Sequence, residues 1–93
     1  MSLSRNQARR IAEKALPLLF PGLVEAVRID EGGTRQVKDH WVFFWDTVEY
    51  LETGEENARL AGNAPIVVRA SDGKAFKADI RRTLEEQLVI RNE

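Results

Sequence analysis

The segment WVFFWDTVEYLETGEEN, residues 41–57, opens with five residues that hold both tryptophans and two of the four phenylalanines of this 93-residue chain. Successive side chains of a strand point to opposite faces. A strand over residues 41–45 would therefore place Trp41, Phe43 and Trp45 on one face and Val42 and Phe44 on the other. Burying each of these side chains contributes roughly 1.5–3 kcal/mol. The pattern predicts an interior strand that is covered on both sides.

The second part of the segment is acidic and contains no lysine or arginine. Its acidic residues are Asp46, Glu49, Glu52, Glu55 and Glu56, and Tyr50 lies among them. Residues 30–57 carry eight acidic and two basic residues, although the net charge of the whole chain is only -1. A nucleic-acid-binding protein normally shows a coherent basic stripe. The charge distribution therefore argues against a nucleic-acid partner and favours a basic protein partner for this segment.

The N-terminal residues predict an amphipathic helix. Ser4 and Gln7 have the spacing of a capping box, in which each side chain bonds the backbone N–H of the other residue. Apolar residues then recur at helical spacing, at positions 8, 11, 12, 15, 16 and 19. Pro17 and the Pro21-Gly22 pair disfavour continuation of the helix. We expect the helix to end between Leu16 and Leu19.

Three further strands and a second helix complete the predicted fold. Residues 23–30, 65–69 and 74–77 read as strands, and the last two are joined by the turn sequence Ser71-Asp72-Gly73. Asp79 can cap a helix whose apolar stripe comprises Ile80, Leu84 and Leu88. We therefore expect residues 1–93 to form a single α+β domain: a small antiparallel four-stranded sheet flanked by an N-terminal and a C-terminal helix, in the order α-β-β-β-β-α.

Composition excludes several classes of protein. The chain has no cysteine, so it forms no disulfide, and a cytoplasmic location is expected. The longest uncharged run, which ends before Glu25, is shorter than the roughly 20 residues of a membrane span and contains two prolines. The N-terminal apolar positions are interrupted by Glu13 and Lys14, which argues against a signal peptide. We expect neither a membrane span nor a membrane partner.

Motifs for catalysis, metal binding or cofactor binding are absent. The single histidine, His40, directly precedes the aromatic strand and is accompanied by no recognisable nucleophile motif, so a packing or surface role is favoured. The acidic segment lacks the spacing of a calcium loop, and the glycines do not form a phosphate loop. Trp41, Phe43 and Trp45 could stack on bases or sugars, but core packing is favoured because basic residues do not surround them.

The ordered set of motifs resembles the immunity protein 35 family, the YrhB-like domains of bacterial polymorphic toxin systems. The matching features are the aromatic strand WVFFW, then YLETGE at residues 50–55, LAGNAPIVV at residues 60–68, and Asp72-Gly73. The resemblance covers about residues 41–76. It implies a non-enzymatic bacterial protein that binds and neutralises a cognate protein toxin inside the cell that makes it.

The resemblance and the charge pattern together predict the contact surface: Asp46, Glu49, Glu52, Glu55 and Glu56, with Tyr50 as an anchor. A basic toxin effector domain would be steered toward these acids. A small chaperone or holdase, a role also associated with YrhB-like proteins, is the alternative, and it would need an exposed apolar patch. An enzyme or small-ligand binder would need a cleft that combines His40 with two carboxylates.

Overall fold

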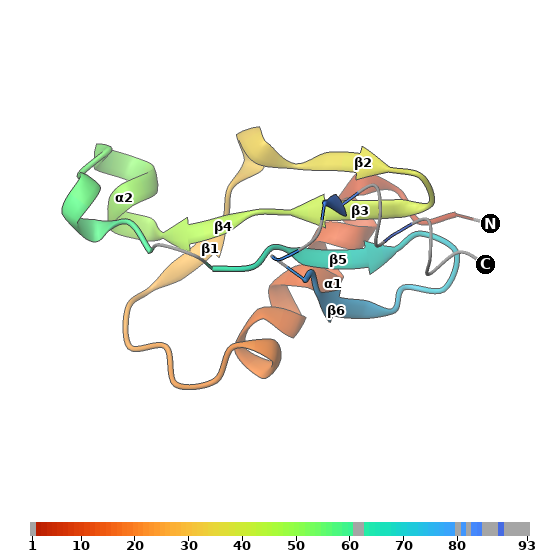
Figure 1. Ribbon diagram of the computed structural model, residues 1–93, viewed down its shortest axis with the longest axis horizontal. Helices are drawn as coiled ribbons and strands as arrows, with labels where there is room; N and C mark the ends of the chain where they lie inside the picture. The colour runs from red at the N-terminus through yellow and green to blue at the C-terminus, as the bar shows by residue number, and fades with distance from the viewer. Residues whose placement is uncertain (1, 61–62, 80, 82, 85–87, 89–93) are drawn as a thin grey trace.

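The computed structural model describes residues 2–60, 63–79, 81, 83, 84 and 88 (Figure 1). Its strands form two antiparallel sheets, a two-stranded sheet in the order β1-β4 and a four-stranded sheet in the order β2-β3-β5-β6. The molecule is elongated, with extents of 40 × 27 × 24 Å. The elements are α1 (Arg5–Leu19), β1 (Val27–Ile29), η1 (Glu31–Gly33), β2 (Arg35–Val37), β3 (His40–Phe43), β4 (Trp45–Thr47), α2 (Val48–Thr53), η2 (Glu56–Ala58), β5 (Ile66–Arg69) and β6 (Ala75–Lys77).

The N-terminal helix is confirmed, together with its cap. Both bonds of the capping box between Ser4 and Gln7 are present, and α1 continues through Pro17 to Leu19. The segment before the helix is fixed by two bonds to the sheet. The backbone N–H of Leu3 donates to the carbonyl of Ala70 at 2.8 Å, and its own carbonyl accepts from the indole N–H of Trp41 at 3.1 Å.

The prediction of a single four-stranded sheet that includes residues 23–30 and 41–45 is wrong. The aromatic segment forms two strands, because it changes partners at Phe44. Phe43 is paired with Ile66 of β5, whereas Trp45 is paired with Ile29 of β1. The carbonyl of Phe44 accepts from the backbone N–H of Asp30 at 2.7 Å, which joins the two sheets at this point.

The sequence pattern did not predict β2, which forms one edge of the larger sheet beside β3. β2 pairs with β3 through a tight turn in which Lys38 has a positive φ of 55°. β3 therefore lies between β2 and β5, as an interior strand should. The hairpin of β5 and β6 agrees with the prediction, and Gly73 has the positive φ, 76°, that its turn requires.

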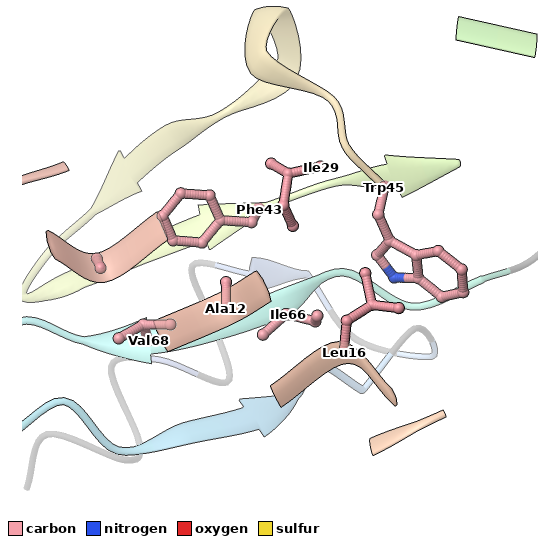
Figure 2. Close-up of a cluster of buried hydrophobic side chains, with 8 residues drawn as sticks. Ala12, Leu16, Ile29, Phe43, Trp45, Ile66 and Val68 are labelled. Carbon is pink, nitrogen blue, oxygen red and sulfur yellow. The ribbon is translucent and has the colours of Figure 1, made fainter. Parts of the chain in front are cut away.

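The prediction that both faces of the aromatic strand are covered is confirmed. Helix α1 lies against one face, where Ala12 and Leu16 approach Phe43, Ile66 and Val68, with Trp45 at one end of the cluster and Ile29 between Phe43 and Trp45 (Figure 2). A second cluster lies on the other face of the sheet. Its buried members are Val37, Val42, Val67, Ala78 and Leu88.

The predicted C-terminal helix falls mainly on residues outside the described part of the chain. Ile80 is among those residues, whereas Leu84 and Leu88 are described and pack in the second cluster. The side chain of Asp79 accepts from the backbone N–H of Arg81 at 3.0 Å, but residue 81 lies in a turn and residue 83 is not helical, so among the described residues this bond caps a turn and not the predicted helix. Within the described residues, no helix is long and apolar enough to cross a membrane.

Candidate protein-binding surface

The acidic segment contains a short helix, α2, at one end of the elongated molecule (green in Figure 1). Thr47 caps this helix, because its hydroxyl accepts from the backbone N–H of Tyr50 at 3.0 Å. Gly54 ends it in the left-handed conformation with a φ of 75°, and donates its N–H to the carbonyl of Tyr50. Sequence reasoning missed α2, although a threonine before the helix and a glycine after it are typical helix boundaries.

Asp46 lies inside the protein, unlike the glutamates that follow it. It is 8% exposed. Its Oδ1 atom accepts from the backbone N–H of Thr47 at 2.8 Å and from that of Leu60 at 2.9 Å. The hydroxyl of Thr47 also donates to the carbonyl of Ala58 at 2.8 Å. These bonds hold the segment after η2 against β4, so Asp46 fixes the shape of the acidic segment and does not stand on its outer face.

The remaining acids of the predicted contact surface are exposed, and we call them the acidic surface: Glu49, Glu52, Glu55 and Glu56. Glu49 and Glu52 belong to α2, and Glu56 begins η2. Tyr50 also belongs to α2 and is half-buried.

Two arginines from outside the acidic segment approach the acidic surface. Arg28 of β1 lies 3.3 Å from Glu52, and Arg59 lies 4.0 Å from Glu56. The sequence shows a segment without bases, but folding brings Arg28 beside Glu52, and Arg59 lies just after the segment in the chain. Within the described residues, Glu49 and Glu55 form no ion pair. Exposed ion pairs contribute only about 0–1 kcal/mol, so they hold the side chains weakly, and the surface keeps an excess of negative charge.

A hollow of about 620 Å³ lies beside the acidic surface, and we call it the α2 hollow. Arg59 stands at this hollow with its Cζ atom 5.5 Å from the centre of the Tyr50 ring. Sequence reasoning did not predict the hollow, because its walls come from distant parts of the chain. The lining includes Asp30, Phe44, Trp45, Asp46, Tyr50, Glu56, Arg59 and Asn63.

Of the other candidates from the sequence, His40, Phe43 and Trp45 lie in the interior, whereas Trp41 is half-buried. His40 is fully buried, and its ring meets Phe76 edge-on with 6.2 Å between ring centres. Phe43 and Trp45 are buried in the core, and the indole N–H of Trp45 donates to the carbonyl of Ala64 at 2.8 Å. Core packing therefore accounts for these two aromatic side chains. Within the described part of the chain, no group of three or more potential metal ligands occurs.

Comparison with known families identifies the relatives of the chain. The family model described as immunity protein 35 matches residues 6–87, which is most of the sequence. The chain belongs to the immunity protein 35 family. The family assignment extends well beyond residues 41–76 and includes α1, which the sequence motifs alone did not cover.

A sequence relative supports a YrhB-like domain within this family. The chain is 44% identical over 48 residues to the uncharacterized protein YrhB of Escherichia coli (strain K12). The alignment covers 52% of this chain and 51% of YrhB, so it spans about half the length of that relative. No solved structure matches this immunity protein 35 family member.

Proposed function

We propose that the protein neutralises a cognate toxin by binding it, and that the acidic surface is the main contact. The observation that carries this proposal is the exposed set of glutamates on α2 and η2, two of which have no ion-pair partner among the described residues. The family is named for immunity, and such a role requires a protein surface that recognises one partner.

Electrostatics supports a basic toxin as the partner. Many toxin effector domains act on nucleic acids, and such domains need basic surfaces to bind phosphates. Opposite charges speed the encounter of two proteins, and steered association reaches about 10⁸–10⁹ M⁻¹s⁻¹ at low salt. Rapid capture suits an immunity protein, because the toxin must be blocked before it acts on the cell that makes it.

The internal bonds of the acidic segment support a pre-formed contact. Asp46 and Thr47 hold α2 and the segment after η2 through buried or half-buried hydrogen bonds. A surface that is ordered before binding loses less conformational entropy when the partner arrives. The backbone of α2, which carries Glu49 and Glu52, is therefore already ordered before the partner binds.

A growth assay tests this function. A tagged copy of the protein is used to recover its partner from native cells, and the partner is then expressed alone and together with the protein in a second host. We expect the partner alone to stop growth and the wild-type protein to restore it. Glu49→Lys with Glu55→Lys should weaken protection, whereas Glu13→Lys on α1 should not. A partner that does not affect growth would contradict the immunity role.

The surface gives less support to the alternative of a holdase. A holdase needs an exposed apolar patch of several hundred square ångströms. Among the described residues, the exposed large hydrophobic side chains are Leu18, at 81% exposure, and Val24, at 90%. Single exposed apolar side chains are common in soluble proteins and do not indicate binding of unfolded chains.

A further inference from the structure

We propose that the α2 hollow receives one basic side chain, an arginine or a lysine, from the toxin. This inference rests on the proposed immunity function and adds the chemistry of the anchoring residue. The hollow adjoins Glu56 of the acidic surface, so a partner that docks on that surface lies beside the opening.

The first support is the half-satisfied carboxylate of Asp46. Asp46 is 8% exposed and lines the hollow. Its Oδ1 atom accepts two backbone N–H groups, whereas its Oδ2 atom makes no hydrogen bond within the described residues. A carboxylate that is largely removed from water gains most from a charged donor at its free oxygen. A guanidinium or ammonium group in the hollow supplies that donor.

The second support is the aromatic wall. Phe44 and Tyr50 line the hollow and are half-buried, whereas Trp45, which also lines it, is only 3% exposed. Aromatic faces attract cations by about 0.5–1 kcal/mol at exposed sites, and by more where water is excluded. They also pack against the apolar stems of arginine and lysine. Arg59 already lies 5.5 Å from the centre of the Tyr50 ring, which shows that this wall accepts a guanidinium group.

Charge and size agree with the same occupant. The lining contains three acids, Asp30, Asp46 and Glu56, against one base, Arg59. The excess of carboxylates repels an acidic side chain and attracts a basic one. A volume of about 620 Å³ is large enough to admit one arginine or lysine side chain. A partner side chain buried in such a hollow has the setting of an interface hot spot.

The test is a titration of the 15N-labelled protein with two blocked tripeptides, Gly-Arg-Gly and Gly-citrulline-Gly. Citrulline has nearly the shape of arginine but no charge. We expect the arginine peptide to shift the amide signals of residues 44–46, 50 and 59–60 in a saturable manner, and the citrulline peptide to leave them unchanged. Equal shifts with both peptides, or shifts that avoid these residues, would overturn the proposal.

Point variants test whether the arginine peptide binds in the hollow. Asp46→Asn should weaken binding of the arginine peptide about tenfold, since it removes a charged hydrogen bond. Because Asp46 also holds the backbone, Glu56→Gln provides a second variant at an exposed position, with an expected weakening of about twofold. Glu13→Gln is the matched control, because Glu13 is an exposed acid on α1 that does not line the hollow. A Glu13→Gln effect as large as that of Glu56→Gln would contradict the assignment.

Binding measurements with the recovered toxin show whether the inference about the hollow fails alone or together with the proposed immunity function. If the toxin binds wild type and Tyr50→Leu equally well but loses affinity for Glu49→Lys, the immunity role stands and the hollow is not the anchor site. If no recovered partner is toxic, the immunity role fails, and the inference about the toxin side chain fails with it.

Discussion

The guanidinium group of Arg59 lies over the ring of Tyr50, with 5.5 Å between the Cζ atom and the ring centre. Arg59 is the residue that follows η2, and Tyr50 belongs to α2. The contact therefore links the two short helical elements of the acidic segment. It also places a cation where we propose that a cation of the toxin binds.

The substitution Arg59→Gln should strengthen binding of the Gly-Arg-Gly peptide. It removes the competing positive charge from the hollow and frees the face of Tyr50. We expect an affinity increase of about two- to fivefold, which corresponds to a cation–aromatic contact of roughly 0.5–1 kcal/mol. The measurement is the same titration of amide signals. Arg10→Gln, at an exposed position of α1, is the control, and weaker binding to Arg59→Gln would contradict the proposed competition.

The substitution Thr47→Val should destabilise the protein by about 1–3 kcal/mol. Valine keeps the shape of threonine but loses the cap to the N–H of Tyr50 and the bond to the carbonyl of Ala58. Thr47 is 4% exposed, so the lost partners are not easily replaced by water. Urea denaturation of the two proteins gives the difference in the free energy of unfolding.

Thr53→Val is a matched control for the Thr47 prediction. The hydroxyl of Thr53 also makes two hydrogen bonds, to the carbonyl of Glu49 and from the N–H of Glu55, but at an exposed position. Water can replace these partners, so we expect Thr53→Val to lower the free energy of unfolding by less than about 1 kcal/mol. Equal losses for the two variants would show that burial does not determine the strength of the Thr47 contacts.

The substitution Ile66→Ala should lower the free energy of unfolding by about 2–5 kcal/mol, because it truncates a fully buried side chain in the cluster against α1. Ile66 is also paired with Phe43 at the point where the aromatic segment leaves the larger sheet. Leu18→Ala is the control, since Leu18 is 81% exposed and its truncation should change stability by less than about 0.5 kcal/mol. Thermal unfolding should separate the two variants clearly.

Local signals in the sequence predicted the elements that depend on neighbouring residues. The cap at Ser4, the helical spacing of Ala8, Ala12 and Leu16, and the turn at Gly73 all agree with the structure. The two apolar faces of residues 41–45 were also predicted, because strand periodicity needs no knowledge of the partner strand. α2 was not predicted, although Thr47 and Gly54 are local signals of its boundaries.

The remaining features depend on contacts between distant residues. The exchange of partners at Phe44 requires both Ile66 and Ile29 to be in place, and no local pattern specifies it. Arg28 and Glu52 are 24 residues apart in the chain, so a charge count along the sequence could not bring them together. Likewise, the burial of Asp46 follows from its bond to Leu60, which lies 14 residues further on.

The most direct test of the central claim is the association rate with the recovered toxin, measured at low and high salt for wild type and for Glu49→Lys with Glu55→Lys. We expect the double variant to associate about tenfold more slowly at low salt, because two charges that steer the encounter are reversed. The difference should largely disappear at about 1 M salt, where the screening length falls to about 3 Å. Glu13→Lys should behave like wild type. Equal association rates for wild type and the double variant at low salt would contradict binding through the acidic surface.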